Sequence, residues 1–548
     1  MNLIKGNYIL LLILACFAIY FVNLDAIYVN IMEARNFISA REMIQKNNWL
    51  LPTLNDEARY QKPPLPTWIT AFSGLLFGIK NLVALRLPAA IMALFLVVIS
   101  YKFLSRLTNN YKYAFISSLV LSTSFYIVLA GRDGQWDIFT HAFMMGCIYY
   151  LYQLFTTKKN KFRLAIIAAL FFGMSFLSKG PVSAHTLLIP FIISYGIVFK
   201  FKNIKSRIKP LLLFIVVGLI LSGWWHAYVY WKDPIELIKI TQKEAWNWQG
   251  HNVKPFYYYW SFFIQSGAWA ILALIGMAYP YLKDKVSNKK AYKLTIIWTV
   301  ASLVLLTILP AKKSKYLLPT LIPLAFNTGF YLEYLILNFS TLKKKIETYP
   351  VLINFGLIAI IGVSFPIWGY LFMKDSFNGN WFWFILLAFI IAVISILIFK
   401  NLFKKNIQNA FYLIILFICI TISFGMPLVK KISINPEFNN ISKVALWEVN
   451  THNKVYEFKD LTPELIWEYG KPMPILIKGD VITLPSEKSF GVLIRDERME
   501  KFFEVFKDYS VKKITRYNIN PREKNSSQYR TRLCRNLYLV STSSLPNE

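Results

Sequence analysis

The stretch from Lys80 to Ser100, KNLVALRLPAAIMALFLVVIS, is apolar along almost its whole length. A helix needs about 20 mostly apolar residues to cross the hydrocarbon core of a bilayer. This stretch therefore predicts a membrane-spanning helix, and similar stretches along the chain predict about 13 in all. Their ranges are 8–24, 80–100, 113–130, 138–155, 164–178, 182–199, 211–229, 259–281, 292–310, 316–337, 351–373, 381–399 and 410–428.

The composition supports the same class of protein. Of the 548 residues, 56% are hydrophobic and only 16% are charged, whereas a soluble domain has about 25% charged residues. The net charge of +32 raises the possibility of nucleic-acid binding. Most of the excess lies in short Lys/Arg clusters between apolar runs, as the positive-inside rule predicts for a membrane protein. Membrane lipids are therefore expected as partners, and nucleic acid is not.

The basic clusters also predict the orientation of the chain. They fall in every second loop: Lys102, Arg106 and Lys112; Lys158, Lys159, Lys161 and Arg163; Lys200, Lys202, Lys205, Arg207 and Lys209; Lys283, Lys285, Lys289 and Lys290; Lys343, Lys344 and Lys345; Lys400, Lys404 and Lys405. Cytoplasmic loops carry such clusters, so the N-terminus is expected inside and the C-terminal segment outside. The first apolar run has no small-residue cleavage site and is expected to stay in place as a helix.

The expected domains are a membrane domain at 1–430 and a small extracytoplasmic α/β domain at 431–548. The tail at 431–548 alternates apolar and polar residues, as in PILIKGDVITL and FGVLIRD, which predicts strands. Two long outer loops are expected at 25–79 and 230–258. Within the first, IMEARNFISAREMIQKNNWL (31–50) has the periodicity of an amphipathic helix, expected to lie in the membrane interface.

No cofactor is predicted. The four cysteines, Cys16, Cys147, Cys419 and Cys534, are scattered and form no metal or redox pattern. No metal site is predicted either, although a pair of aspartates leaves a divalent ion open. A nucleotide-binding signature such as a P-loop is also absent from the sequence.

Charged residues at the predicted outer ends of the helices are the candidate functional residues, because charge near the hydrocarbon is costly. They are Glu33, Arg35, Lys62, Asp133, Asp137, Lys179, Glu244, His251, Lys312, Lys313 and Lys315, with Tyr316 beside them. Cations at this depth suit a lipid phosphate, and a carboxylate can take a proton from an attacking hydroxyl. The residues therefore predict group transfer from a lipid phosphate on the outer face.

Structural explanations compete with each functional one. Glu33 and Arg35 are also what a solvated helix face would carry. A helix dipole favours an acidic residue at the position of Asp137, and Lys179 suits a snorkelling lysine. His251 suits an ordinary loop. The block Lys312, Lys313 and Lys315 is the hardest to explain this way, because positive charge is disfavoured on the outer side; a local anion would account for it.

Several motifs together resemble a known family. They are MEARNFISAREM (Met32–Met43), LNDEARYQKPPL (Leu54–Leu65), the aspartate of GQWDIFTH (Asp137), Ser178-Lys179-Gly180 and AKKSKYLLP. The pattern resembles the polyprenyl-phosphate-dependent glycosyltransferases of the GT-C fold. The most similar branch includes the lipid A aminoarabinose transferase and is related to the protein O-mannosyltransferases. The resemblance covers roughly the first 340 residues, and the tail matches nothing in the family.

The resemblance implies roles for individual residues. Arg35, Lys62 and Tyr316 match residues that hold the lipid phosphate, and the lysine block adds Lys312 and Lys313. Asp137 matches an acidic residue beside the donor cavity, and with Glu33 it is the expected catalytic acid or base. Further cavity candidates are Gln61, Lys179, Glu244 and His251.

Three positions depart from the family pattern. Met32 stands where the family has aspartate, so the acidic role is assigned to Glu33, the next residue. Gln61 stands where the family has glutamate, and an amide cannot act as a base near neutral pH. Ala245 stands where a histidine often follows the glutamate.

The expected function is that of an integral glycosyltransferase of the bacterial inner membrane. It would move a sugar from a polyprenyl-phosphate donor to lipid A, another glycan or a protein on the outer face, with inversion. Two alternatives remain open: a transporter (flippase) for a lipid-linked glycan, and a non-catalytic scaffold that binds a lipid phosphate.

Overall fold

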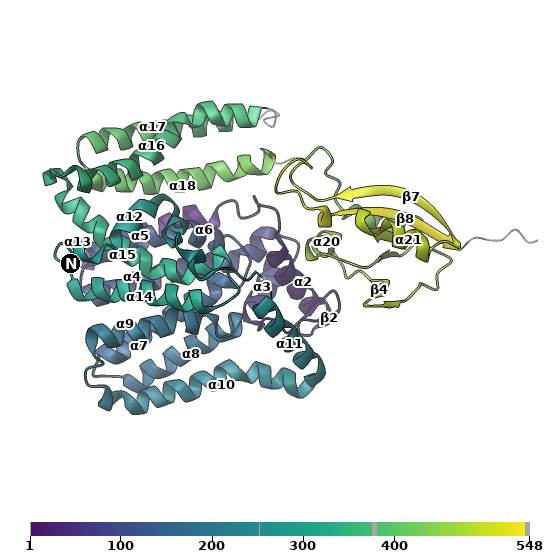
Figure 1. The fold of residues 1–548 in the computed structure, drawn as a ribbon, viewed down its shortest axis with the longest axis horizontal. Helices are drawn as coiled ribbons and strands as arrows, with labels where there is room; N and C mark the ends of the chain where they lie inside the picture. Colours follow the sequence, from purple (N-terminus) through teal and green to yellow (C-terminus); the bar gives the residue numbers. More distant parts are fainter. Residues whose placement is uncertain (1, 251, 375–380, 433–434, 543–548) are drawn as a thin grey trace, which may run out of the picture. The chain divides into compact units, whose positions relative to one another are not determined.

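The computed structural model describes residues 2–250, 252–374, 381–432 and 435–542. The chain forms two compact units (Figure 1). The first, called the helical unit, comprises Met1–Leu24 and Tyr60–Leu428. The second, called the mixed unit, comprises Asp25–Arg59 and Val429–Glu548. An N-terminal segment of the chain therefore folds with the C-terminal region.

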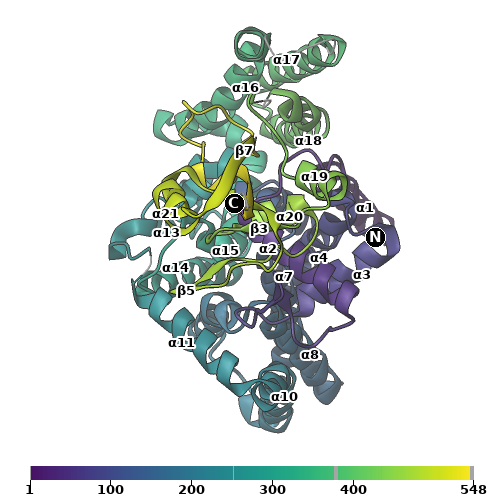
Figure 2. The same ribbon diagram turned by 90° about the vertical axis from the view of Figure 1, so that its right-hand side faces the viewer.

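The helical unit consists almost entirely of helices. They are α1 (Asn2–Cys16), α3 (Leu65–Phe77), α4 (Leu82–Thr108), α5 (Tyr111–Ser122), α6 (Phe125–Gly131), α7 (Asp137–Thr156), α8 (Lys161–Lys179), α9 (Ile189–Phe199), α10 (Ile208–Lys232), α11 (Pro234–Gly250), α12 (Ala270–Gly276), α13 (Tyr279–Leu282), α14 (Lys289–Ile308), α15 (Leu318–Asn338), α16 (Lys345–Met373), α17 (Trp381–Phe403) and α18 (Ile407–Ile432). Figure 2 views many of them nearly end-on.

The chain is a multi-pass integral membrane protein, as predicted, but the predicted number of spans is too high. Among the described residues, nine helices are long and apolar enough to cross a membrane. A tenth results if α5 and α6, bent by 69° at their junction, count as one span. The runs expected at 8–24 and 182–199 form shorter apolar helices, Asn7–Phe21 and Ala184–Phe199. Both helices are shorter than the about 20 residues that a crossing needs, so counting apolar runs without knowing where each helix begins and ends overcounts the spans.

Burial separates central helices from peripheral ones. The apolar window of the span containing α15 is 83% buried, whereas that of the span containing α10 is only 22% buried. At the centre, the ring of Phe103 on α4 lies 5.9 Å from the ring of Trp298 on α14 and 6.2 Å from that of Phe326 on α15. The core of the unit therefore lies around α4, α14 and α15, and α10 presents its face to lipid.

The two segments predicted as long outer loops contain helices, and the helix expected within 31–50 is present as Ile31–Lys46. The segment 25–79 contains a helix, a short hairpin and α3, and the segment 230–258 is mostly α11. Both segments contain enough periodic apolar residues to fold as helices, which the length criterion for spanning helices does not detect.

The mixed unit contains helices from both parts of the chain that form it, and one main sheet. Its elements are α2 (Ile31–Lys46), β1 (Thr53–Leu54), β2 (Glu57–Ala58), α19 (Lys443–Thr451), β3 (Val455–Glu457), α20 (Pro463–Tyr469), β4 (Ile477–Lys478), β5 (Val481–Ile482), β6 (Ser489–Ile494), α21 (Met499–Val505), β7 (Tyr509–Asn518) and β8 (Cys534–Thr542). The sheet order is β3-β6-β8-β7, with β3 and β6 parallel and the other pairs antiparallel. The α/β character predicted for the tail is confirmed.

Alternating side chains of this sheet form two cores. On one face Val455, Leu493 and Leu537 pack with Leu465 of α20. On the other, Val492, Ile494 and Val540 pack with Phe502 of α21. This is the period-two pattern of strands that are covered by helices on both faces.

The helix α2 packs against α20 within the mixed unit. Ala34 and Ile38 form an apolar cluster with Ile466 of α20, and the ring of Phe37 lies 5.4 Å from that of Trp467. Even the charged Arg41 is buried, and its Nη2 donates to the Ile466 carbonyl at 3.4 Å. These contacts cover part of the apolar face of α2 with protein, and the predicted position at the membrane interface stays a prediction.

Candidate functional site

A group of charged and polar residues meets where α7 begins in the helical unit. This group, called the charge cluster, comprises Asp133, Gln135, Asp137, His141, Lys179, Lys315 and Tyr316. They come from the connection between α6 and α7, from the first turns of α7, from the end of α8 and from the short helix η6 (Ser314–Leu317).

An ion pair lies at the centre of the charge cluster. Lys179 Nζ donates to Asp137 Oδ1, and the two side chains are only 12% and 15% exposed. The same Nζ lies 5.7 Å from the centre of the Tyr316 ring. The pair forms because Asp137 opens α7 and Lys179 closes α8, and α7 and α8 pack side by side (Figure 1).

A second lysine enters from η6. Lys315 Nζ donates to Gln135 Oε1 at 3.3 Å, and Gln135 Nε2 in turn donates to the Asp133 carboxylate. The charges acting on Lys315 include those of Asp137, Lys179 and Asp133. Two lysines, Lys179 and Lys315, and two aspartates, Asp133 and Asp137, thus share one small volume. Tyr316 borders it.

His141 was missed by the sequence analysis. It lies one helical turn after Asp137 on the same face of α7, is 2% exposed, and its Nδ1 has no hydrogen-bond partner among the described residues. The spacing of four residues from a predicted functional aspartate was the signal available in the sequence. Gln135 was also missed, and nothing in the sequence marks it.

The lysine block divides by role. Lys312 Nζ donates to the Lys254 carbonyl at 3.0 Å, and its N–H donates to the Asn252 carbonyl. The exposed Lys313 accepts at its carbonyl from the Tyr259 hydroxyl at 3.3 Å. Of the three lysines, Lys315 belongs to the charge cluster. Lys312 instead links its own segment of the chain to the segment 252–254.

The proline-rich connection before α3 is fixed at one end. Tyr60 Oη donates to Asp233 Oδ2 at 2.9 Å, and Pro64 and Pro66 begin α3. Gln61 Oε1 is buried without a hydrogen-bond partner among the described residues, and Lys62 is half-buried. Gln61 and Lys62 therefore lie on a rigid connection of the helical unit.

Two further predicted residues, Glu244 and His251, lie on α11 and directly after it. Glu244 is half-buried on α11, and its charge acts on Tyr316. His251 lies outside the described residues, so its predicted role stays a prediction.

Glu33 and Arg35 lie on α2 of the mixed unit. The Asn30 side chain accepts from the N–H of Glu33 at 3.2 Å, and Glu33 Oε2 accepts from the N–H of Asn30 at 3.3 Å. This is a capping box, and Glu33 is 1% exposed. Arg35 is half-buried and its Nη1 lies 3.7 Å from Met32 Sδ. Glu33 therefore has a structural task, and its predicted catalytic role stays a prediction.

A metal site is not visible in the described parts of the chain. No three His, Cys, Asp or Glu residues come together there in a way that could hold an ion. Within the charge cluster, lysines stand beside the aspartates.

Comparison with known proteins supports the resemblance. Residues 61–226 match the family described as dolichyl-phosphate-mannose-protein mannosyltransferase. An uncharacterized protein of Aquifex aeolicus is 27% identical over 353 residues, which cover 61% of this chain and 65% of that protein. The undecaprenyl phosphate-alpha-4-amino-4-deoxy-L-arabinose arabinosyl transferase of Photorhabdus laumondii is 24% identical over 419 residues, 69% of this chain and 72% of that enzyme.

The fold has a counterpart among solved structures. The crystal structure of ArnT from Cupriavidus metallidurans bound to undecaprenyl phosphate matches with a TM-score of 0.70, over 99% of both chains, at 16% identity. The likeness therefore extends to the C-terminal region, for which the sequence showed none. These findings confirm both the predicted fold class and the predicted resemblance.

Proposed function

We propose, starting from the kinship of this chain with the polyprenyl-phosphate glycosyltransferases of the GT-C fold, that it transfers a sugar from a polyprenyl phosphate to an acceptor. The proposed acceptors are lipid A, another glycan or a protein, and the proposed place is the outer face of the bacterial inner membrane. The observation that carries the proposal is the charge cluster, where two lysines, a tyrosine and two aspartates share a small volume in a membrane protein.

The cationic side of the charge cluster suits the donor phosphate. Lys179 and Lys315 are ammonium groups, and a phosphate oxygen is a stronger partner for Lys315 than the neutral Gln135 amide that it now contacts. The Tyr316 hydroxyl can donate a further hydrogen bond. Negative charge grows on the phosphate as its bond to the sugar breaks, so these groups stabilise the transition state. The resemblance adds Lys62 and Arg35 as proposed phosphate ligands.

The acidic side suits the acceptor. When a donor phosphate binds Lys179, it competes with Asp137 for that lysine. The released carboxylate of Asp137 can then accept the proton of an acceptor hydroxyl. The hydroxyl oxygen attacks the anomeric carbon, and the bond from that carbon to the phosphate oxygen breaks with its electrons on the phosphate. A single displacement of this kind inverts the anomeric centre. Asp137 is preferred to Glu33 as the base because Glu33 already accepts a hydrogen bond in the capping box of α2.

Transfer of a labelled sugar from a polyprenyl phosphate in proteoliposomes tests this proposal. Asp137→Asn should lower the transfer rate about 10²- to 10⁴-fold, the range for loss of a general base. The matched control is Asp284→Asn, since Asp284 also pairs with a lysine but is 65% exposed. Full turnover by Asp137→Asn would exclude it as the base. Binding of polyprenyl phosphate without any turnover by the wild type would instead favour the scaffold alternative.

A further inference from the structure

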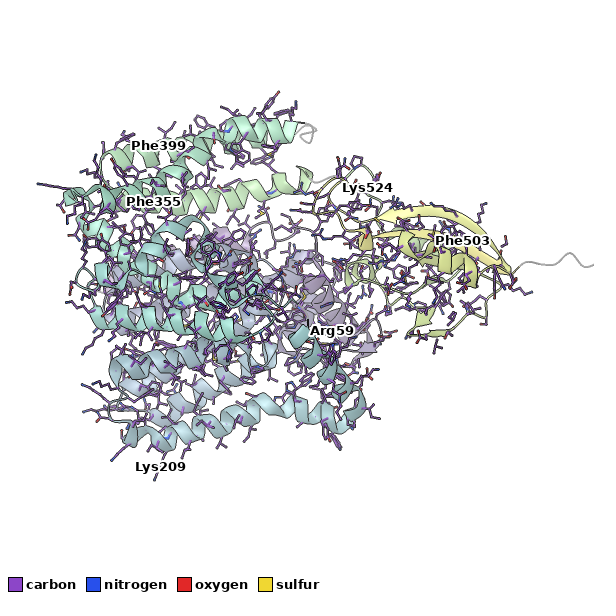
Figure 3. All side chains as sticks on the ribbon, viewed as in Figure 1. Arg59, Lys209, Phe355, Phe399, Phe503 and Lys524 are labelled. Carbon is purple, nitrogen blue, oxygen red and sulfur yellow. The ribbon has the colours of Figure 1, made fainter. Side chains whose placement is uncertain are left out.

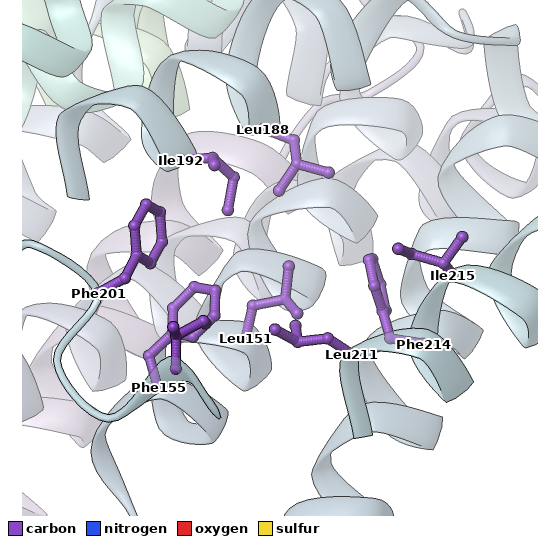
Figure 4. Close-up of a pocket in the computed structure, with 9 residues that line it drawn as sticks. Leu151, Phe155, Leu188, Ile192, Phe201, Leu211, Phe214 and Ile215 are labelled. Carbon is purple, nitrogen blue, oxygen red and sulfur yellow. The ribbon is translucent and has the colours of Figure 1, made fainter. Parts of the chain in front are cut away.

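An apolar cavity lies in the helical unit, apart from the charge cluster. It has a volume of about 410 Å³ and is lined only by apolar side chains, which come from α7, from Leu188 just before α9, from α9 and α10, and from the connection between α9 and α10 (Figure 4). This volume is in the range of small-molecule sites, roughly 300–1,000 Å³. Its lining includes Phe155, Ile192, Phe201, Ile204 and Ile215.

The cavity and the charge cluster lie at opposite ends of α7. Asp137 begins this helix, and Phe155 is next to its last residue. A rise of about 1.5 Å per residue separates the two by about 27 Å along the axis. The cavity is therefore not part of the proposed catalytic site.

The cavity borders the lipid-facing surface. Its lining residue Ile215 is 49% exposed, and nearby on α10 Leu212 and Val216 are 56% and 55% exposed. In a membrane these side chains contact acyl chains. A chain from the surrounding lipid can therefore enter beside α10.

The connection between α9 and α10 is held in a costly conformation that completes the cavity. Lys200, Phe201 and Asn203 all have positive φ, at 55°, 42° and 60°, and an aromatic residue rarely adopts this region. This backbone conformation places the centre of the Phe201 ring 5.6 Å from the centre of the Phe155 ring. Backbone strain of this kind is typical of functional sites.

A buried arginine maintains this conformation. Arg207 Nε donates to the Leu154 carbonyl at 2.8 Å, and its Nη1 donates to the carbonyls of Lys202 and Asn203 at 3.0 and 2.9 Å. The connection is thus locked to the end of α7, and two of its residues, Phe201 and Ile204, line the cavity.

The same connection carries a dense positive charge. Lys200, Lys202 and Lys205 are exposed on it, and the exposed Lys209 follows at the start of α10, where Figure 3 labels it. Lys161 Nζ donates to the Ser206 carbonyl at 3.1 Å, which brings the basic start of α8 alongside. No Asp or Glu occurs between Asp137 and Asp233 in the sequence, so these segments carry no acidic residue of their own.

We propose that the cavity binds an acyl chain of an anionic phospholipid, whose phosphate is held by the lysines of the 200–209 connection. The apolar lining takes the chain and the lysines take the charge. The basic loops predict that this end faces the cytoplasm, where anionic lipids attract such clusters. A polyprenyl phosphate is a poorer candidate for this cavity. If its phosphate bound at the charge cluster, only its prenyl chain could reach the cavity, and the lysines at 200–209 would have no anion to bind.

The test measures the thermal stability of the purified full chain with phosphatidylglycerol or phosphatidylcholine of identical acyl chains. Phosphatidylglycerol should raise the Tm more than phosphatidylcholine, because a ligand that binds the folded state stabilises it. The excess should disappear in Lys202→Gln/Lys205→Gln, and it should remain in Lys343→Gln/Lys344→Gln, an exposed pair in another basic loop. An equal effect of both lipids on the wild type, or an undiminished excess in Lys202→Gln/Lys205→Gln, would overturn the proposal.

A cavity-filling variant tests the acyl chain separately. Ile192→Trp should weaken retention of phosphatidylglycerol in native mass spectrometry and leave the stabilisation by polyprenyl phosphate unchanged. The opposite result, with polyprenyl phosphate lost and phosphatidylglycerol kept, would assign the cavity to the prenyl chain and reject the proposal. If Ile192→Trp does not fold, the comparison of Lys202→Gln/Lys205→Gln with the wild type still tests the proposal.

Discussion

The charge cluster of the helical unit and α2 of the mixed unit use the same kinds of side chain differently. In the charge cluster, Lys315 Nζ donates to a neutral amide at 3.3 Å, and Lys179 lies beside both a carboxylate and an aromatic ring. On α2, Glu33 closes a capping box and Glu42 accepts three hydrogen bonds from the β1–β2 segment. Under the proposed function, charges of the first kind exchange partners with a ligand, whereas charges of the second kind serve the fold.

The strongest test of a committed charge is Glu457 in the mixed unit. Arg535 Nε contacts both Glu457 oxygens at 2.8 and 2.9 Å, and the two side chains are 0% and 1% exposed. Glu457→Gln leaves a buried guanidinium without its counter-charge, so we expect a loss of about 3–5 kcal/mol in the stability of this unit. Chemical denaturation monitored by limited proteolysis measures it. Asp460→Asn, which affects a pair 38–43% exposed, should cost less than about 1 kcal/mol.

Lys315 tests the opposite case. Lys315→Met should lower sugar transfer about 10²- to 10³-fold, the loss typical of removing one transition-state donor, while the unfolding temperature changes little. Labelled transfer and thermal unfolding are measured on the same preparation. Lys313→Met is the informative companion, since Lys313 is exposed and its carbonyl makes the contacts seen here. An equal loss of sugar transfer in both variants would indicate that the whole lysine block, and not Lys315 in particular, binds the phosphate.

Glu42 tests whether α2 is structural as a whole. Glu42→Ala removes acceptors for the Thr53 hydroxyl at 2.5 Å and for the N–H of Asn55 at 2.8 Å. We expect the mixed unit to lose about 2–3 kcal/mol, because hydrogen bonds to a charged group contribute about 1.5–3 kcal/mol each and the freed donors recover some of it from water. Protease sensitivity around the β1–β2 segment reports the effect. A stability equal to the wild type would contradict a structural role.

The smallest expected effect separates the two roles of Glu33. Glutamine also completes a capping box, so Glu33→Gln should change stability by less than about 1 kcal/mol and leave sugar transfer within a few-fold of the wild type. Glu33→Ala serves as the comparison, since it removes the acceptor for the N–H of Asn30 while Asn30 remains the N-cap. A large loss of transfer in Glu33→Gln at unchanged stability would restore Glu33 as the catalytic base.

Much of the fold followed from the sequence because hydropathy and strand alternation are local properties. The predicted runs at 80–100, 381–399 and 410–428 correspond to α4, α17 and α18. Errors in the span count arose where an apolar run forms a helix too short for a crossing, as Ala184–Phe199 does within the run predicted at 182–199. The environment of α2 was also missed, because its apolar partner Ile466 lies more than four hundred positions away in the sequence.

The candidate site was predicted only in part, and for a similar reason. Asp137, Lys179 and Tyr316 were singled out by type and by motif, but their contacts were not. His141 and Gln135 became visible only once α7 and η6 were in place. Lys312 and Lys315, close in the sequence, face different partners because the chain turns into a helix between them.

The sequence by itself determined that this is a multi-pass membrane protein with a basic side and an α/β tail, because composition, hydropathy and charge pattern are properties of each segment alone. Only the tertiary structure decided which charges are committed and which remain available. Asp137 and Lys179 are 42 positions apart, and Gln135 and Lys315 are 180 apart. Whether such side chains meet depends on how whole helices pack, and helix packing is set by contacts between segments that no single segment specifies.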